Sequence, residues 1–151
     1  MDYIGIDAYF PLIKSKTPTV AKLTKAWKRI TTKLHLLSLR NRKPVIITEY
    51  GYRSCDRACW NQWEIESLPD TSPVNLEAQI NGYSAFYEAL WKERWLAGAF
   101  LWKWHAHETA GGYQNSNYTP QNKPVEAVIK NWYGKEPVSY THLTLPTICS
   151  V

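Results

Sequence analysis

Three short apolar runs along the chain have the pattern of buried β-strands. Tyr3–Tyr9, Val45–Thr48 and Leu96–Trp104 are rich in β-branched, aromatic and small apolar residues, and polar or aromatic side chains follow at the end of each. The third run is apolar on both faces for six residues, which is typical of a strand covered on both sides. We therefore predict three strands, the third buried between two layers.

Between and after these runs, apolar residues recur at three- and four-residue steps, as in amphipathic helices. The first helix is expected after Thr17, as its cap, with Pro18 at its first position. Its apolar stripe comprises Val20, Leu23, Trp27, Ile30, Leu34 and Leu37. Two further helices are expected at about Leu76–Arg94 and Pro124–Trp132, and Gly134 ends the last one.

The order of strand and helix, repeated three times, predicts an α/β fold with a parallel sheet and right-handed crossovers. An open doubly wound sheet and part of a (β/α)8 TIM barrel both fit this order. We favour the barrel because the long polar loops all leave from the carboxyl ends of the strands, where barrel active sites form. A complete barrel takes about 250 residues and is closed by pairing of its last and first strands. We therefore expect the C-terminal part of a barrel, with two sheet edges left without a partner strand.

The two ends of the chain carry separate expectations. Residues 1–136 are expected to form the partial barrel domain, and residues 137–151 to lie outside it. The final stretch SYTHLTLPTICSV follows a helix that has already ended and resembles adaptor-derived read-through, with a short extra strand as the alternative. The start, MDYIGIDAYF, has no signal-peptide pattern and enters a predicted strand at once, which suggests a chain cut from something longer.

Charge alters this picture little. The formal net charge is +5, and many basic residues fall in the first predicted helix, namely Lys22, Lys25, Lys28, Arg29 and Lys33. A nucleic-acid groove is one interpretation, but no aromatic-plus-basic RNA motif accompanies these residues, so a solvated helix face is favoured. No run of eighteen apolar residues occurs. Neither nucleic acid nor a membrane is an expected partner, and the oligomeric state and compartment stay undetermined.

Cysteine and histidine residues give only weak evidence for a disulfide or a metal site. Cys55 and Cys59 fit either one loop disulfide or two free thiols, and three cysteines in all are too few for a disulfide framework. His105, His107 and Glu108 look like a metal cluster, but two imidazoles with no defined third ligand favour a polar loop lining. No phosphate loop or nucleophile elbow occurs. We therefore expect no metal and no cofactor.

The stretch VIITEYGY, residues 45–52, drives a buried strand directly into the carboxylate of Glu49. A carboxylate at the carboxyl end of a barrel strand is held rigidly toward the site, as retaining glycosidases require of their nucleophile. Tyr9 follows the preceding strand and is expected to donate a hydrogen bond that keeps Glu49 ionised and oriented. The alternative is an ion pair between Glu49 and Arg53 in the next loop.

Two tryptophans end the third predicted strand. A tryptophan at this position offers a platform for the apolar face of a pyranose, and the alternation of side chains lets at most one face the site. We expect Trp102 to face the site and Trp104 to pack under a helix. The strand ends supply the candidates for substrate binding, which are Asp7, Tyr9, Tyr52, Trp102, Lys103 and His105.

Together these stretches resemble glycoside hydrolase family 113, whose members are (β/α)8 barrels of glycosidase clan A. The resemblance spans about residues 2–134, and TEYG and LWKW in this order and spacing are its most specific parts. The matching stretches are DYIGIDAYFPL at 2–12, KPVIITEYGYRS at 43–54, NGYSAFYEALW at 81–91, GAFLWKWH at 98–105 and YTPQNKPVEAVIKNWYG at 118–134.

The resemblance implies about strands six to eight of the barrel, with their helices, and makes residues 1–136 a partial glycosidase catalytic domain. It implies a retaining hydrolase of β-1,4-linked mannan or manno-oligosaccharides, so the expected partner is an oligo- or polysaccharide. It implies Glu49 as the nucleophile, Tyr9 as its support, and Trp102 as the floor of the subsite that holds the reacting sugar.

One departure from the family bears on activity. The family's acid/base is a glutamate preceded by asparagine, and no Asn-Glu pair occurs in this chain. Glu64, Glu66 and Glu108 are loop residues without that context. Retaining chemistry needs two carboxyls about 5 Å apart, so we expect the chain alone to be inactive. Another clan-A glycosidase, acting on glucan, galactan or xylan, and a non-catalytic carbohydrate-binding barrel remain as alternatives.

Overall fold

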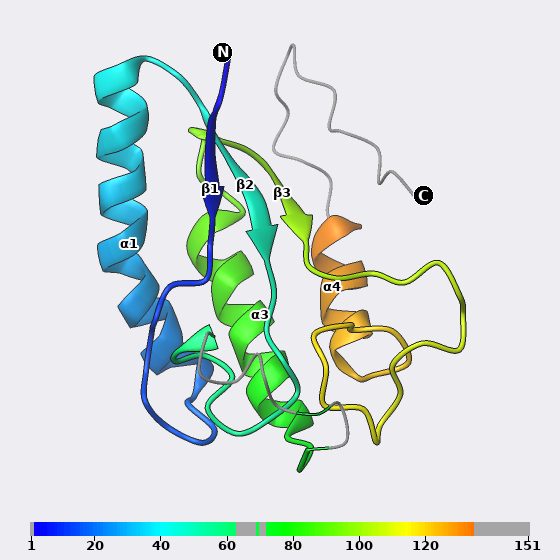
Figure 1. Cartoon of the computed structure of the whole chain (residues 1–151). Coiled ribbons are helices and arrows are strands. Elements are labelled where there is room, and N and C mark those ends of the chain that lie inside the picture. The colour runs from blue at the N-terminus through cyan, green and yellow to red at the C-terminus, as the bar shows by residue number, and fades with distance from the viewer. Residues whose placement is uncertain (1, 63–68, 70–71, 135–151) are drawn as a thin grey trace.

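The computed structural model describes residues 2–62, 69 and 72–134. Strands and helices alternate in the predicted order (Figure 1): β1 (Ile4–Asp7), α1 (Val20–Asn41), β2 (Val45–Tyr50), α3 (Leu76–Leu90), β3 (Leu96–Leu101) and α4 (Val125–Tyr133). The tail predicted at 137–151 lies outside the described residues, as do Glu64 and Glu66. None of the described helices has the length and apolarity to cross a membrane.

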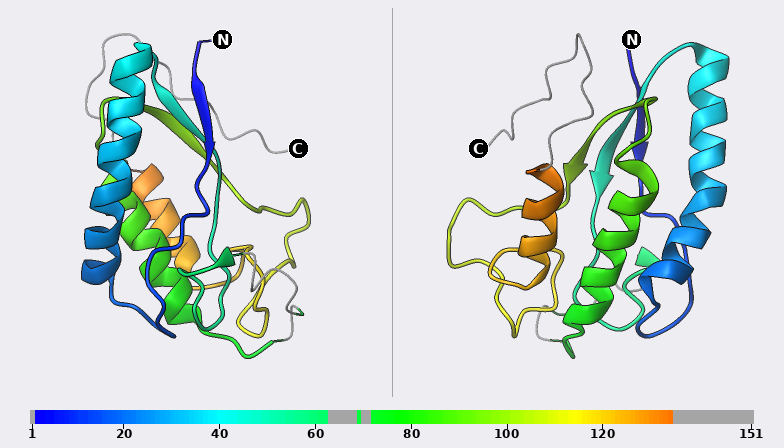
Figure 2. Two further views of the ribbon diagram at one scale, coloured as in Figure 1. Left: turned by 60° about the vertical axis from the view of Figure 1, so that its left-hand side comes forward. Right: turned by 180° about the vertical axis from the view of Figure 1, so that it is seen from behind.

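The three strands form a parallel sheet in the order β1-β2-β3. The described helices α1, α3 and α4 all lie on one face of this sheet (Figures 1 and 2). A doubly wound sheet carries helices on both faces, whereas a (β/α)8 barrel places them all on its outer side. The layering therefore favours a barrel segment over the open sheet.

The helix-covered face holds the core. Val45 and Ile47 of β2 are fully buried, and so are Leu23 and Trp27 from the predicted stripe of α1. Aromatic rings of α3 fill the layer between sheet and helices, with Phe86 stacked on Tyr50 and edge-on to Trp27. Burial of these side chains follows the period of each element, alternate residues in the strands and every third or fourth residue in the helices.

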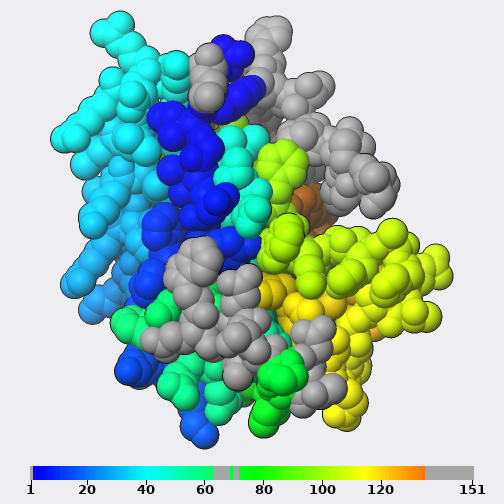
Figure 3. All heavy atoms as spheres, viewed as in Figure 1, coloured from blue at the N-terminus to red at the C-terminus, as the bar shows by residue number. Residues whose placement is uncertain are grey.

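The opposite face of the sheet is open. Gly5 and Asp7 in β1, Thr48 in β2 and Phe100 in β3 are all exposed. Figure 3 shows atoms of the three strands at the molecular surface on this side. The expectation that the third strand is covered on both sides is therefore wrong for the described chain. Phe100 is 51% exposed, and no described helix covers this face.

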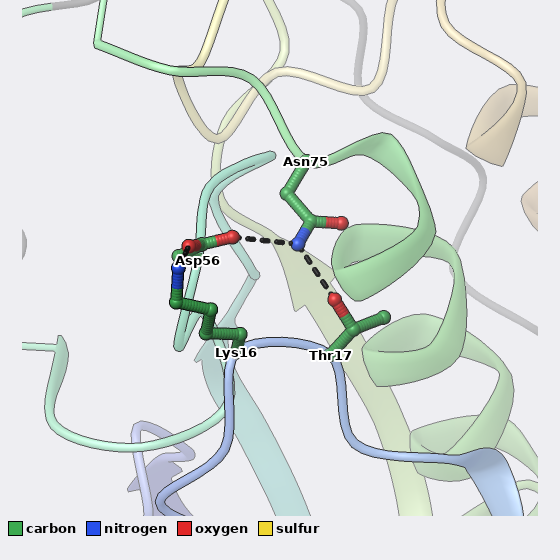
Figure 4. Close-up of polar contacts among 4 residues, drawn as sticks. All are labelled: Lys16, Thr17, Asp56 and Asn75. Carbon is green, nitrogen blue, oxygen red and sulfur yellow. Dashed lines mark hydrogen bonds and ion pairs between the residues drawn. The ribbon is translucent and has the colours of Figure 1, made fainter.

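The start of α1 also differs from the prediction. The helix begins at Val20, its N-cap is Thr19, and Thr19 makes no side-chain capping bond. Thr17 instead accepts a hydrogen bond from Asn75 Nδ2 at 2.7 Å, and the same amide donates to Asp56 at 2.8 Å (Figure 4). The Asn75 oxygen accepts from the backbone N–H of Ala78 and so caps α3. One side chain thus caps α3 and joins two loops that are distant in sequence.

Candidate active site

The ends of β1 and β2 place Tyr9 beside Glu49. The Tyr9 hydroxyl donates to Glu49 Oε2 at 3.0 Å, which confirms the predicted hydrogen bond. The backbone supports this pairing, since the N–H of Ala8 donates to the carbonyl of Glu49 at 2.7 Å. An extra residue in β2, Thr48, shifts the register so that Asp7 pairs with Glu49, whereas an unbroken register would pair Asp7 with Thr48. The bulge therefore helps to set which side chains meet at this edge.

Electrostatics keeps the pair in its hydrogen-bonded form. Burial raises the pKa of Tyr9 well above its ordinary value, and the hydrogen bond to Glu49 and the charge of that carboxylate raise it further. Tyr9 therefore stays protonated through the physiological range and remains a donor. A carboxylate that accepts a hydrogen bond from a fixed donor has one oxygen oriented and the other available.

The alternative partner of Glu49, Arg53, is engaged elsewhere. Arg53 is 2% exposed, and its guanidinium donates to the carbonyls of Ser116 and Pro69 and to the Ser116 hydroxyl. Within residues 2–62, 69 and 72–134, no ion pair joins it to Glu49. Arg53 thus ties the loop after β2 to the loop after β3.

Asp7 and Thr48 lie on the open face next to the pair. The Thr48 hydroxyl donates to Asp7 Oδ1 at 2.6 Å, and both residues are exposed. Asp7 was predicted as a substrate contact, whereas Thr48 was not. Its sequence signal is the alternation of β2, which puts Thr48 on the face opposite to the buried Val45 and Ile47.

Trp102 is held against the end of β2. Its backbone N–H donates to the carbonyl of Tyr50 at 2.8 Å, and a Cβ built on Gly51 would lie 2.0 Å from the Trp102 carbonyl oxygen. Only glycine at position 51 permits this approach of the two strand ends. The Trp102 ring is 45% exposed, and Lys103, which follows it, is partly buried.

Trp104 does not pack under a helix, so that expectation is wrong. Its side chain is 55% exposed. The physical reason is that β3 ends at Leu101, and the alternation of a strand no longer applies to the residues beyond it. Both tryptophans therefore offer ring surface to solvent.

His105 lies in the loop after β3. Its backbone N–H donates to Gln121 Oε1 and its carbonyl accepts from Gln121 Nε2, at 2.6 and 3.1 Å, and its ring stacks on that of His107. Gln121 was not predicted as a positioning residue, and nothing in its local sequence marks it. Among the described residues, no group of three or more His, Cys, Asp or Glu side chains could hold a metal ion.

Tyr52 is separated from the other candidates. It is 3% exposed, its ring packs edge-on against Tyr83 at 5.4 Å, and a Cβ on Gly82 would meet it at 2.7 Å. The prediction that Tyr52 binds substrate is therefore contradicted by its burial in the core. Cys55 and Cys59 nearby are free thiols, and burial raises the pKa of Cys59 to about 12.

Comparison with known proteins identifies the family. The sequence profile of Glycoside Hydrolase Family 113 matches residues 1–123. The chain belongs to this family. No curated protein sequence matches it.

Solved structures give a consistent picture of the fold. A GH113 β-1,4-mannanase matches 89% of this chain with a TM-score of 0.64 and 23% identity. The GH113 β-mannanase of Alicyclobacillus acidocaldarius, in complex with ManMIm, matches 88% with a TM-score of 0.62 and 25% identity. A Faecalibacterium prausnitzii β-glucuronidase, 16% identical, matches 93% of this chain and 23% of its own, with a TM-score of 0.57.

The chain spans about 40% of the length of the GH113 structures that it matches, 40% of the first and 39% of the second. Its α/β fold is thus similar to part of a family 113 barrel.

Proposed function

We propose that this family 113 chain supplies the nucleophile-bearing part of a retaining β-mannoside hydrolase. The observation that carries the proposal is the hydrogen bond from Tyr9 to Glu49 across two adjacent strand ends. A strand-end carboxylate with one oxygen fixed by a protonated phenol has the form of a positioned nucleophile. In this proposal residues 1–136 form strands six to eight of the barrel with their helices, and residues 137–151 are not part of the catalytic domain.

The proposed reaction follows the retaining pathway. Glu49 attacks the anomeric carbon and forms a glycosyl ester while the glycosidic bond breaks and the leaving oxygen takes up a proton from an acid. Water then cleaves the ester and restores the carboxylate. Tyr9 orients Oε2 throughout, and the exposed ring of Trp102 supports the apolar face of the reacting sugar. Asp7, Lys103 and His105 are retained as contacts to sugar hydroxyls.

The proposed substrate is β-1,4-linked mannan or its oligosaccharides. This assignment is supported by family membership and by the β-mannanases among the similar structures, one of them in complex with ManMIm. No cofactor is part of the proposed reaction.

The chain alone is proposed to be inactive on natural mannosides. No Asn-Glu pair occurs in it, and Glu108 is an exposed loop residue. Loss of a general acid costs about 10²–10⁴-fold in rate. An activated leaving group needs no proton, however, so the nucleophile is testable without the acid.

The experiment treats the purified chain with 2,4-dinitrophenyl 2-deoxy-2-fluoro-β-mannoside, which forms a long-lived ester with a retaining nucleophile. Mass spectrometry of the peptides is expected to place the sugar on Glu49. Glu49→Gln should give no adduct, and Tyr9→Phe should form it about tenfold more slowly because the donor is lost. Mannohexaose should not be hydrolysed by the chain.

Four outcomes would contradict parts of the proposal. An adduct on another carboxylate would remove Glu49 as nucleophile. Turnover of mannohexaose that Glu49→Gln abolishes would refute the inactivity of the chain. Reaction with the glucoside, galactoside or xyloside analogue alone would change the substrate class. Oligosaccharide binding that depends on Trp102, with no adduct from any reagent, would favour a non-catalytic sugar-binding barrel.

A further inference from the structure

A shallow hollow of about 260 Å³ lies on the loop that follows β3, where it meets the start of α4. Its lining comes from the first residues of this loop, from its last residues and from the first turn of α4. The lining residues are Trp104, His105, Ala106, Glu108, Gln121, Asn122 and Glu126. Pockets for drug-sized ligands span about 300–1,000 Å³, so this hollow suits something smaller, such as one pyranose unit.

The wall of the hollow is built by hydrogen bonds. Gln121 Nε2 donates to the carbonyls of His105 and His107. Asn122 Nδ2 donates to the carbonyl of Glu108 at 2.7 Å, and the Asn122 backbone N–H donates to Glu126 Oε2 at 3.0 Å. The loop on one side is therefore fastened to the residues before α4 on the other. Such a site needs little ordering when a ligand enters.

The groups that the hollow presents are those that recognise a neutral sugar. Trp104 exposes 55% of its side chain, and an indole face matches the apolar face of a pyranose. Glu108 is exposed and lines the hollow, so its carboxylate oxygens are accessible to hydroxyl donors. Glu108 and Glu126 together repel anions, which disfavours uronic acids at this place.

We propose that this hollow is a second sugar-binding site, which holds one neutral hexose unit of a polysaccharide through Trp104 and Glu108. The sugar stacks on the Trp104 ring and donates hydroxyl hydrogens to Glu108. Such a site retains a polymer chain on the protein by contacts that do not involve Glu49. The choice of mannan as the polymer rests on the proposed function, whereas the preference for a neutral hexose rests on the hollow alone.

The test follows the indole N–H signals of the ¹⁵N-labelled 151-residue chain during titration with mannohexaose, cellohexaose or trigalacturonate. Trp104→Ala identifies the Trp104 signal and is expected to weaken hexose binding at this site by at least about tenfold, because the aromatic face on which the sugar stacks is lost. Tyr113→Ala is the matched control, because Tyr113 lies in the same loop, is 62% exposed and does not line the hollow. It should leave the affinity unchanged.

A second variant tests the charge. Glu108→Gln is expected to weaken mannohexaose binding by about two- to fivefold, because an amide oxygen is a poorer acceptor than a carboxylate, and to admit trigalacturonate. Trigalacturonate binding to the unchanged chain as tightly as mannohexaose would overturn the proposal. So would hexose affinity that Trp104→Ala leaves intact.

The titration separates this inference from the proposed function. Shifts of Trp104 with cellohexaose but not with mannohexaose would keep the hollow as a hexose site and contradict the mannan assignment. Shifts that depend on Trp102 alone would contradict the hollow and leave the assignment standing. Absence of any Trp104 shift with either neutral oligosaccharide at millimolar concentration would reject the second site.

Discussion

The two faces of the three-stranded sheet differ in what they do. On the helix-covered face, Tyr50, Phe86 and Trp27 form one continuous group of buried rings. On the open face, the exposed side chains of Thr48 and Asp7 form a short hydrogen bond. The first face supplies the apolar burial that stabilises the chain, whereas the second carries few groups whose loss would unfold it.

Glu49 and Tyr9 lie where these two faces end. They are partly buried, so they are held by the packed side and still reachable from the open side. At such a boundary the proposed functional pair gains rigidity from a core to which it contributes little. Substitutions on the two faces should therefore have separable effects, which the first of four predictions tests directly. The other three test the strand-end and loop contacts that hold the packed side together.

The largest effect is expected from two phenylalanines on opposite faces. Phe86→Ala empties a fully buried site between Tyr50 and Trp27 and should lower the free energy of unfolding by about 3–5 kcal/mol. Phe100→Ala removes a ring that is 51% exposed and should change it by less than about 1 kcal/mol. Urea denaturation of both variants is the measurement. Equal losses would mean that the two faces are not energetically distinct.

The next effect concerns the contact between the ends of β2 and β3. Gly51→Ala places a methyl group 2.0 Å from the Trp102 carbonyl oxygen, so one strand end must move. This movement should lower the free energy of unfolding by about 1–3 kcal/mol. Gly5→Ala is the control, since its Cβ meets only the exposed side chain of Thr48, at 3.1 Å from the methyl and 3.9 Å from the hydroxyl oxygen. Denaturant midpoints should fall for Gly51→Ala and stay close to the parent value for Gly5→Ala, and the reverse order would refute the role of Gly51.

The third effect concerns the side chain that caps α3. Asn75→Ala should lower the free energy of unfolding by about 1–2 kcal/mol, because it removes the cap of α3 and both loop contacts. Asn41→Ala loses one exposed hydrogen bond to the Leu37 carbonyl and should cost less than about 0.5 kcal/mol. Thermal unfolding with far-UV detection compares the two. A small loss for Asn75→Ala would show that the loops hold together without it.

The smallest effect is pH-dependent. The hydrogen bond from Asn75, followed by the contact with Lys16, holds the pKa of Asp56 below its ordinary value. A carboxyl with a lowered folded-state pKa stabilises the protein above its unfolded pKa, and this contribution is lost as the pH falls through the folded value. Because the Asp56 side chain is 43% exposed and solvent screens it, the contribution should be below about 1 kcal/mol.

Asp56→Asn should therefore lower the free energy of unfolding slightly at pH 6, and the difference from the parent chain should shrink below about pH 4. Asp2→Asn, at an exposed position, is the control. A difference that grows on acidification would contradict the assigned sign.

Much of the fold could be predicted from local pattern. The periods of Val45–Thr48 and of the stripe from Leu23 to Leu34 are local properties, and the structure has a strand and a helix there. The family resemblance likewise depended on contiguous stretches, and the family profile confirms it. Thr17 and Trp104 were wrongly placed because element ends depend on tertiary contacts, such as the bond from Asn75, more than on local pattern.

By itself, the sequence determined the order of strands and helices, the strand-end position of Glu49 and the family, because each follows from short-range spacing along the chain. Only the tertiary structure decided that Asp7 pairs with Glu49 across the bulge at Thr48, that Tyr52 is buried, and that all described helices share one face of the sheet. These outcomes depend on register, on the bulge at Thr48 and on packing between segments some forty residues apart, and no local pattern encodes such distances.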